Sequence, residues 1–376
     1  MEAGKLSVCI IAKNEEQNIE RCLRSLKPYP FEIVAVDTGS ADRTKEIAEA
    51  YADRVYDFTW CEDFAAAKNF AVSKASHPYV MVIDSDEYLD AVDFDRLLEM
   101  LSRHPGDVGR IRRVNILTRE NEVQEKTEWI NRIFPKEQYR YEGRIHEQIE
   151  AADGREYRTY QTPVVIRHTG YDLPDEKKRE KAYRNISLLK QELKRLEEGN
   201  DGEKIPYILY QLGKGYFMAE EYQSACGYFS RGLSFDLNPG LEYVIDMVET
   251  YGYALLNSGQ PKEALQFEQI YPEFGNTADF QFLMGLIYMN NACFDAAVSE
   301  FQKAARQTSC KTSGVNSYAA YYNIGVIYEC LGDEAQAKAY YRRCGAYLPA
   351  NKRLKQWSED AGKNRQNEKQ NRKKEL

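Results

Sequence analysis

The chain has 376 residues, of which 43% are hydrophobic and 29% are charged, and its formal net charge at pH 7 is −8. That length is sufficient for two domains, and the composition is ordinary for a globular protein. The negative charge argues against a protein that wraps nucleic acid or coats an anionic membrane. We therefore expect no nucleic-acid partner.

The cysteines and the hydropathy narrow the class of protein further. None of the eight cysteines stands in a C-x-x-C spacing, so zinc sites and thioredoxin-like motifs lose their support. Scattered thiols in a chain of this length are typical of the reducing cytosol. No apolar run approaches the roughly 18 residues of a membrane helix, and the first residues do not resemble a secretory signal. We expect a soluble, cytoplasmic protein with no integral membrane segment.

The first half of the chain alternates short apolar strands with amphipathic helices. Leu6–Ala12 is almost continuously apolar, as expected for a strand that is buried on both faces. Asp42 is placed to cap one of the helices. Further strands are predicted at 31–36 and 79–83, and helices at 16–26, 42–52 and 64–75. This β-α-β-α order predicts a parallel sheet with helices on both faces.

The second half, from about residue 205, contains no convincing strand and repeats its small residues at fixed intervals. Four glycines, spaced 39, 33 and 40 residues apart, are each followed twelve residues later by an alanine. An aromatic residue lies sixteen residues after three of these glycines, and Glu268 takes that position in the second copy. The pairs are Gly213/Ala225, Gly252/Ala264, Gly285/Ala297 and Gly325/Ala337. Such a pattern lets two helices cross closely, with the aromatics filling the gap between hairpins, and it resembles tetratricopeptide repeats of roughly 34 residues.

The segment between the two halves and the end of the chain differ from both. Residues 176–198 carry an apolar stripe at helical spacing, which predicts an amphipathic bridging helix. Residues 352–376 contain nine Lys or Arg against four Asp or Glu, which predicts an unstructured basic tail. The predicted domains are an α/β domain at 1–174, a bridging helix at 175–202, about four repeats at 203–350 and the tail at 351–376.

Polar and acidic residues follow three of the predicted strands, at 13–16, 37–42 and 84–87. Ligands of open parallel sheets bind outside the carboxyl ends of the strands, so these residues are expected to share one site. The chain has no G-x-G-x-x-G after the first strand and no G-x-x-x-x-G-K-[ST] motif. Dinucleotide-binding and P-loop sites are therefore excluded.

Asp84-Ser85-Asp86 is the sharpest feature of this group. Alternate residues of an extended backbone point the same way, so Asp84 and Asp86 are expected to converge on one hard cation. Two carboxylates that leave coordination positions open suit Mg²⁺ or Mn²⁺ that also binds a diphosphate. The sequence therefore predicts a divalent-cation site at the end of a buried strand.

Four segments, VCIIAKNEEQNIERCL, VDTGSADRT, DFAAAKNFA and VMVIDSDEYLD, resemble the nucleotide-sugar half of family 2 glycosyltransferases with a GT-A fold. The likeness is close over 6–90 and looser at WINRIFPK (129–136), GRIHEQI (143–149) and VIRHTGYD (165–172). The repeats resemble the tetratricopeptide-linked bacterial branch of this family. That branch includes enzymes that glycosylate peptides such as sublancin-type bacteriocins.

Carried over residue by residue, the resemblance implies a nucleotide-sugar site. Asn14 and Glu15 would border the nucleoside pocket, and Asp37 would hydrogen-bond the uracil. Lys68 stands where the family often has Arg, and a lysine cannot supply the bidentate geometry of an arginine. The implied nucleotide-sugar residues are Ala12, Asn14, Glu15, Asp37, Lys68, Asp84, Ser85 and Arg132.

The resemblance also implies metal ligands and places the general base. Asp84 would approach the ribose and the metal, Asp86 would ligate the metal, and His168 is a candidate for a further ligand. Glu147 is the first choice for the base and His146 the second, because both lie on the acceptor side of the sheet in the resemblance. A core pair or surface residues remain an open alternative for these last two.

These features predict a metal-dependent, inverting glycosyltransferase that moves a sugar from a UDP-sugar to a peptide or protein acceptor. The acceptor is inferred from the repeats, since helical-hairpin arrays form extended grooves that suit a chain. One alternative is an enzyme of cell-surface polysaccharide or lipopolysaccharide assembly, and another is a scaffold with a degenerate transferase half. A homodimer through the repeats or the tail also stays open.

Overall fold

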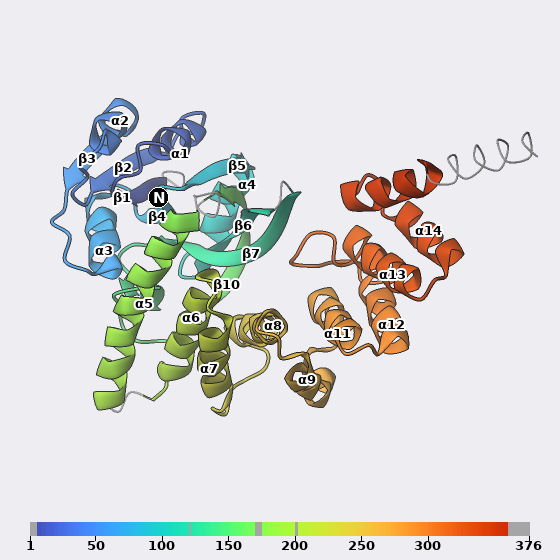
Figure 1. The fold of residues 1–376 in the computed structure, drawn as a ribbon. Coiled ribbons are helices and arrows are strands. Elements are labelled where there is room, and N and C mark those ends of the chain that lie inside the picture. Colours follow the sequence, from blue (N-terminus) through green and yellow to red (C-terminus); the bar gives the residue numbers. More distant parts are fainter. Residues whose placement is uncertain (1–5, 120–121, 170–174, 200–201, 360–376) are drawn as a thin grey trace, which may run out of the picture. The chain divides into compact units, whose positions relative to one another are not determined.

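The computed structural model describes residues 6–119, 122–169, 175–199 and 202–359. The chain divides into two compact units, Met1–Gly202 and Glu203–Leu376, which we call the α/β unit and the helical unit (Figure 1). None of the helices in the described ranges combines the length and apolarity that spanning a membrane requires.

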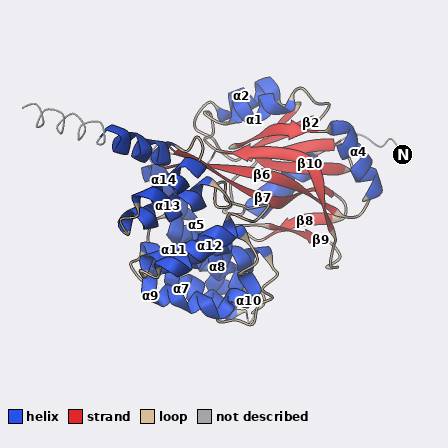
Figure 2. Cartoon of the chain, turned by 90° about the vertical axis from the view of Figure 1, so that its right-hand side faces the viewer, coloured by secondary structure: helices blue, strands red, loops and turns tan. Residues whose placement is uncertain are grey.

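The α/β unit is built on a mixed sheet. Its strands are β1 (Leu6–Ala12), β2 (Glu32–Asp37), β3 (Arg54–Asp57), β4 (Tyr79–Asp84), β5 (Glu87–Val92), β6 (Val108–Arg119), β7 (Glu122–Pro135) and β10 (Thr159–His168). They pair in the order β3-β2-β1-β4-β7-β6-β10-β5, and Figure 2 draws the strands in red. The first four are mutually parallel, whereas β7 runs antiparallel to both of its neighbours and β5 runs antiparallel to β10. A separate hairpin joins β8 (Tyr139–Glu142) to β9 (Gln148–Ala151).

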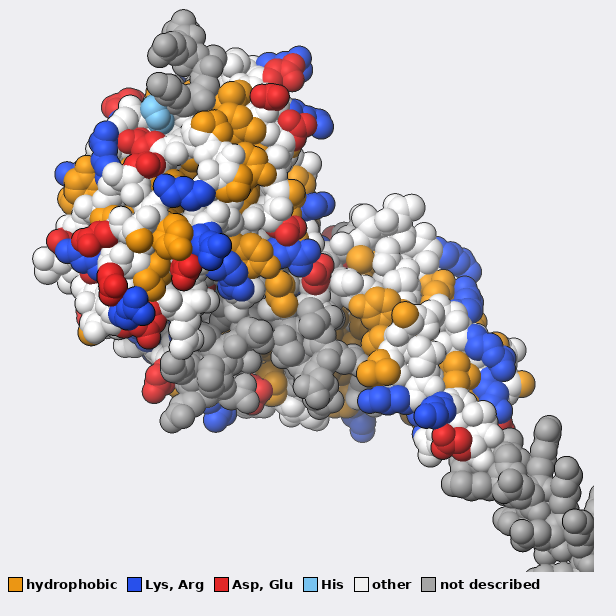
Figure 3. Space-filling model, turned by 90° about the horizontal axis from the view of Figure 1, so that it is seen from above, with side chains coloured by type: hydrophobic (Ala, Val, Ile, Leu, Met, Phe, Trp, Pro, Cys, Tyr) orange, Lys and Arg blue, Asp and Glu red, His pale blue; other side chains and the backbone are white. Residues whose placement is uncertain are grey.

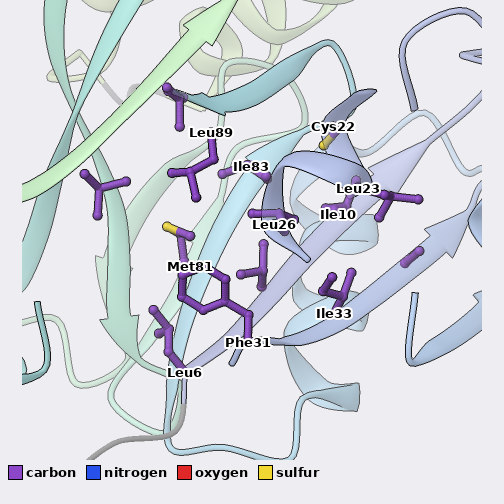
Figure 4. Close-up of a cluster of buried hydrophobic side chains, with 14 of the residues drawn as sticks. Leu6, Ile10, Cys22, Leu23, Leu26, Phe31, Ile33, Met81, Ile83 and Leu89 are labelled. Atoms are coloured by element: carbon purple, nitrogen blue, oxygen red, sulfur yellow. The ribbon is translucent and has the colours of Figure 1, made fainter. Parts of the chain in front are cut away.

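Helices cover both faces of the sheet, as the alternating order of elements predicted. The helices are α1 (Ile19–Leu26), α2 (Thr44–Tyr51), α3 (Phe64–Lys74) and α4 (Phe94–Arg103). Successive β1 residues face opposite sides. Leu6 and Ile10 join a core with α1, α2 and α4, part of which Figure 4 shows, whereas Cys9 and Ile11 join a second core with α3 and the β8–β9 hairpin. The predicted α/β class with a largely parallel sheet is confirmed.

Two helices begin later than predicted because residues of the preceding loops bind backbone N–H groups at the start of each helix. The chain turns at Glu15, whose carbonyl accepts the N–H groups of Asn18 and Ile19, so α1 starts at Ile19 rather than at 16. Asp42 does not sit at the cap position of α2; its carboxylate instead accepts the Thr44 N–H at 3.0 Å. Both loops are thereby fixed at the ends of their strands.

A long helix, α5 (Asp175–Glu198), closes the α/β unit in sequence. The apolar stripe that the spacing predicted is buried along this helix, at Ala182, Ile186, Leu189, Leu193 and Leu196. Its charged residues include Lys181, which contacts Asp86 in the loop after β4. The helix therefore contacts the loop after β4 as well as burying its apolar stripe.

The helical unit consists of antiparallel helical hairpins, as predicted. Its helices are α6 (Ile205–Met218), α7 (Tyr222–Leu233), α8 (Glu242–Asn257), α9 (Pro261–Ala264), η1 (Leu265–Ile270), α10 (Tyr271–Phe274), α11 (Ala278–Asn290), α12 (Phe294–Ala304), α13 (Tyr318–Cys330) and α14 (Glu334–Arg343). In the second copy the returning segment is broken into the short pieces α9, η1 and α10. Glu268, which interrupts the aromatic series, lies in the 3₁₀ piece η1.

The repeated glycines lie where the two helices of a hairpin cross. A Cβ atom on Gly285 would lie 2.6 Å from the Phe301 ring, and one on Gly325 would lie 2.6 Å from the Tyr341 ring. The aromatic residues thus pack on the glycine of their own hairpin rather than simply filling the gap between hairpins. Gly252, whose copy lacks the aromatic residue, faces Leu283 instead.

The end of the described chain differs from the predicted unstructured tail. Residues 348–359 are helical, because Leu354 and Trp357 pack against the cluster around Tyr341. The rest of the predicted tail, 360–376, lies outside the described residues. On the face drawn in Figure 3, acidic and basic side chains alternate over the α/β unit, while the helical unit shows mainly Lys and Arg along its edge.

Candidate active site at the carboxyl ends of the strands

Asp37, the last residue of β2, offers a buried acceptor at the rim of the sheet. Its Oδ2 accepts the backbone N–H groups of Gly39 and Ser40, both at 3.0 Å. Its Oδ1 is buried and has no hydrogen-bond partner among the described residues. Buried acceptors are almost always satisfied in folded proteins, so this oxygen marks a position where a ligand donor would fit.

The loop after β1 packs beside Asp37. Asn14 adopts φ 55°, and its side-chain Oδ1 accepts the Ala41 N–H at 2.8 Å. The Glu15 N–H donates to Thr44 Oγ1 at 2.7 Å, and the Ala12 carbonyl accepts the Thr38 N–H at 2.9 Å. Desolvation raises the pKa of Glu15 above its usual value. The structure therefore brings the residues predicted for the nucleoside pocket together, and it holds the Asn14 side chain in the loop.

Asp84 lies in a compact ion cluster. Its Oδ1 lies 2.9 Å from Lys68 Nζ and its Oδ2 lies 2.6 Å from Arg132 Nη2. The same Lys68 ammonium lies 2.6 Å from Glu147 Oε1. Desolvation opposes ionisation of Asp84, but Arg132 and Lys68 hold its pKa well below the usual range. Asp84 is thus a fixed carboxylate, and Glu147 shares its counter-ion.

Glu87 supports this cluster from the start of β5. Its carboxylate accepts the Asp84 backbone N–H at 2.9 Å and contacts Arg132 and Arg113 at 3.4 and 3.1 Å. The side chain is completely buried. Two arginines and a backbone N–H satisfy the buried charge, as such a charge requires.

Asp86 faces a different set of residues from Asp84. Its Oδ2 lies 3.4 Å from His168 Nε2 and 3.2 Å from Lys181 Nζ. The predicted convergence of the two aspartates assumed an extended backbone, but Ser85 and Asp86 form a turn. Ser85 itself is buried. The turn breaks the alternation of side chains, which is why the two carboxylates have different partners.

His168 is oriented by its neighbour on β6. Asn115 Nδ2 donates to Glu128 Oε1 at 2.5 Å, so the Asn115 Oδ1 faces His168 Nδ1 at 2.9 Å. An amide oxygen only accepts, so Nδ1 carries a hydrogen and, in the neutral ring, Nε2 presents its lone pair to the space beside Asp86. Histidines that ligate metals are held by this kind of second hydrogen bond.

The residues present fit a divalent cation that protein side chains ligate only in part. No group of three His, Cys, Asp or Glu side chains able to hold a metal occurs in the described part of the chain. Asp86 and His168 provide one oxygen and one nitrogen at a shared position, whereas Asp84 is occupied by Lys68 and Arg132. Mg²⁺ is commonly bound through one or two carboxylates together with substrate phosphates, which matches this donor set.

The two candidates for the general base lie together in the segment before β9. Glu147 joins the Asp84 cluster through Lys68. His146 adopts φ 51°, a backbone conformation that is uncommon for residues other than glycine and that often occurs at functional sites. The geometry therefore keeps both residues close to the site.

Sequence reasoning placed Glu87 at this rim without giving it a role of its own, and it missed Asn115 and Lys181. Glu87 is the third carboxylate within four residues, and this density of acidic side chains was a usable signal. Asn115 is a buried polar residue in β6, whose sequence VGRIRRVNILTR shows no clear apolar–polar alternation that would single it out. Lys181 is one of many charged residues on an amphipathic helix, and no local pattern distinguishes it.

Residues 7–157 match the family described as glycosyl transferase family 2. A TPR repeat-containing protein of Synechococcus elongatus is 24% identical over 92% of this chain and 76% of its own length. The lipopolysaccharide core biosynthesis glycosyltransferase LpsC of Rhizobium meliloti is 35% identical over 28% of this chain and 40% of its own length. The glycosyltransferase SunS of Bacillus subtilis, which derives from prophage SPbeta, is 24% identical over 60% of this chain and 52% of its own length.

Among solved structures, S. aureus TarS 1–349 in complex with UDP aligns with a TM-score of 0.36 and 15% identity, over 81% of this chain and 92% of that chain. The family match covers β1 to β9 and includes Asp37, Asp84 and Asp86. Residues 7–157 therefore form a family 2 glycosyltransferase domain, and the protein is a transferase.

Proposed function

We propose that the protein transfers a sugar from a UDP-sugar to a peptide or protein acceptor, with inversion at the anomeric carbon and with Mg²⁺ or Mn²⁺ at Asp86 and His168. The single observation that supports a uridine nucleotide as the sugar donor is the buried Asp37 Oδ1, which lacks a hydrogen-bond partner among the described residues. The N3–H of uracil is a donor of the matching kind. Asp37 also ends a parallel strand, where ligands of such sheets bind.

The side chains around Asp84 support the transfer chemistry. Arg132 and Lys68 keep Asp84 ionised and fixed. Its carboxylate can therefore accept hydrogen bonds from the hydroxyl groups of the UDP-sugar. A bound divalent cation would offset the charge that builds on the departing diphosphate. Asp86 Oδ2 and His168 Nε2 would hold that cation, with Asn115 fixing the histidine ring.

A general base must remove the proton of the acceptor as the new bond forms, which typically contributes about 10²–10⁴-fold to the rate. Glu147 remains our first candidate because it shares Lys68 with Asp84, which keeps it beside the donor site. His146 is the second candidate, since its positive φ shows that the surrounding structure holds it in an unusual conformation.

The acceptor is inferred from the helical unit. Arrays of helical hairpins build extended surfaces that suit a peptide chain, and the described hairpins follow that plan. A saccharide acceptor is the second candidate, because a relative that is 35% identical over part of the domain is named for lipopolysaccharide core biosynthesis. Mass spectrometry of the products would separate the two acceptors.

The test is release of UDP from common UDP-sugars in the presence of Mn²⁺, for the natural protein and for Asp86→Asn. Asp86→Asn should lose several kcal/mol of stabilisation of the charge on the departing diphosphate, which corresponds to a rate loss of about 10³-fold. Asp95→Asn, an exposed aspartate in the first turn of α4, is the matched control and should keep the full rate. If the folded protein released no UDP from any of these donors, the proposed activity would be wrong.

A further inference from the structure

Helix α5 places the Lys181 ammonium beside the same Asp86 oxygen that faces His168. Lys181 Nζ lies 3.2 Å from Asp86 Oδ2, and His168 Nε2 lies 3.4 Å from that oxygen. The Asp86 side chain is only 11% exposed, whereas 43% of the Lys181 side chain remains exposed. The carboxylate is therefore fixed and largely desolvated, while the lysine reaches it from the solvent side.

A carboxylate with so little access to water requires a positive neighbour. Lys181 supplies that charge in the protein without metal. A divalent cation held by Asp86 Oδ2 and His168 Nε2 would lie within a few ångströms of the Lys181 ammonium. Repulsion between like charges at that separation is strong in a partly desolvated site, so the two cations exclude each other.

We propose that the Lys181 ammonium and a divalent cation are alternative occupants of one site, so that metal binding at Asp86 requires displacement of Lys181. This inference rests on the proposed function only in taking Asp86 and His168 as the cation site. The new element is Lys181, a counter-ion for that site that belongs to the chain itself. It lies on α5, outside the residues 7–157 that match the family.

The surroundings of Lys181 allow the exchange to occur by movement of one side chain. Lysine has a flexible four-carbon stem, and its ammonium group is well solvated when it leaves an ion pair. One turn further along α5, Arg184 lies over the Phe64 ring, with its Cζ 5.9 Å from the ring centroid. Together with the buried apolar stripe of α5, this contact keeps the helix in place while the lysine moves.

The first experiment measures Mn²⁺ binding to the full chain without nucleotide, by the electron paramagnetic resonance signal of free Mn²⁺. Lys181→Met removes the competing ammonium and should bind Mn²⁺ about two- to fivefold more tightly than the natural protein, as expected for loss of a partly exposed ion pair. Lys194→Met is the matched control, because Lys194 lies on the same helix and pairs with Glu198 at 3.7 Å, with both side chains largely exposed. It should leave the affinity unchanged.

Equal or weaker Mn²⁺ binding by Lys181→Met would overturn the inference while leaving the metal site of the proposed function intact. Absence of Mn²⁺ binding in both proteins would overturn the inference and the proposed metal site together. Asp86→Asn identifies the site, since it should abolish whatever Mn²⁺ binding the natural protein has.

A second experiment needs no variant. An amine-reactive reagent followed by peptide mass spectrometry reports how accessible each lysine is in the natural protein. Addition of Mn²⁺ should increase the labelling of Lys181 severalfold, because the metal releases it from Asp86, and should not change the labelling of Lys194. Unchanged or reduced labelling of Lys181 at Mn²⁺ concentrations that saturate the site would also overturn the inference.

Discussion

Both units bury charged side chains, but they use them differently. In the helical unit, Asp279 accepts the backbone N–H groups of Lys311 and Thr312 at 2.8 and 2.9 Å, and Glu249 pairs with Lys311 at 2.9 Å. These two carboxylates hold the loop that contains Lys311 and Thr312 against α11 and α8. In the α/β unit, charges from α3, β4, β5 and β7 meet in one cluster around Asp84.

The difference teaches that a buried charge alone does not mark a functional site. What distinguishes the α/β unit is the concentration of its buried charges at the carboxyl ends of parallel strands. In the helical unit, the repeated packing of aromatic rings on glycines holds the two helices of a hairpin together. The predictions below therefore perturb charge in one unit and packing in the other.

The largest effect is expected from Lys68→Met. Lys68 is only 4% exposed and pairs with both Asp84 and Glu147, so its removal leaves two carboxylates short of a counter-ion. Removal of one partner from a buried ion pair costs about 3–5 kcal/mol. The free energy of unfolding, measured by chemical denaturation of the full chain, should fall by about that amount.

Lys45→Met is the matched control for Lys68→Met. Lys45 lies 2.6 Å from Asp57, but 42% and 71% of the two side chains are exposed. An exposed ion pair contributes about 0–1 kcal/mol, so this variant should be close to the natural protein. If the two variants lost the same stability, the cluster around Asp84 would be no more than surface charge.

Acid should weaken the α/β unit through Asp84. Against the effect of desolvation, Arg132 and Lys68 hold the pKa of Asp84 well below the usual range in the folded state, whereas in the unfolded chain it is about 3.9. Its contribution to stability is therefore complete above about pH 4 and is lost as the pH falls toward the folded value. Denaturation curves at pH 7, 5 and 3.5 should show no loss from this group between the first two and a loss at the third.

Lys68→Met tests the cause of that acid response. Without one of its two cations, folded Asp84 should protonate at a pH closer to that of the unfolded chain. The total loss of stability from this group on acidification should therefore be smaller than in the natural protein and should level off at a higher pH, while its onset stays near pH 4. Lys45→Met should show the same loss as the natural protein. The same total loss in all three proteins would contradict the assignment of the acid response to the Asp84 cluster.

Much of the fold follows from local patterns in the sequence. The apolar strands and the Gly/Ala spacing of twelve residues report periodic packing, which is encoded residue by residue along the chain. The exact ends of α1 and α2 do not follow in this way, because Glu15 and Asp42 bind backbone groups of their own loops. The break in the second repeat is visible in the sequence as Glu268, but its conversion to a 3₁₀ segment is not.

The candidate site could be located from the sequence, but its pairings could not. Polar residues after three strands indicate a shared rim because the topology of parallel strands requires it. Which carboxylate meets which cation depends on side chains from distant elements, such as Arg132 on β7 and Lys181 on α5. The turn at Ser85 and Asp86 also overrides the alternation that predicted convergence of Asp84 and Asp86.

The smallest effects are expected from two glycines in the helical unit, and they should have opposite signs. A Cβ atom on Gly285 would lie 2.6 Å from the Phe301 ring, and Phe301 is fully buried, so the ring cannot move without disturbing the core. Overpacking of this kind costs about 1–3 kcal/mol. A Cβ atom on Gly227, in α7, would meet no atom within 4 Å, so Gly227→Ala gains only the helix propensity of alanine, about 1 kcal/mol.

Gly285→Ala should therefore lower the free energy of unfolding and Gly227→Ala should raise it, as measured by chemical denaturation of the full chain. Hydrogen exchange resolved by peptide should show both changes in the helical unit. If both alanines stabilised the protein, the repeated glycines would not be required by the crossing of the helices. Opposite signs would instead show that the glycines are selected by the close approach of an aromatic ring, since both positions are helical and differ mainly in what a side chain would meet.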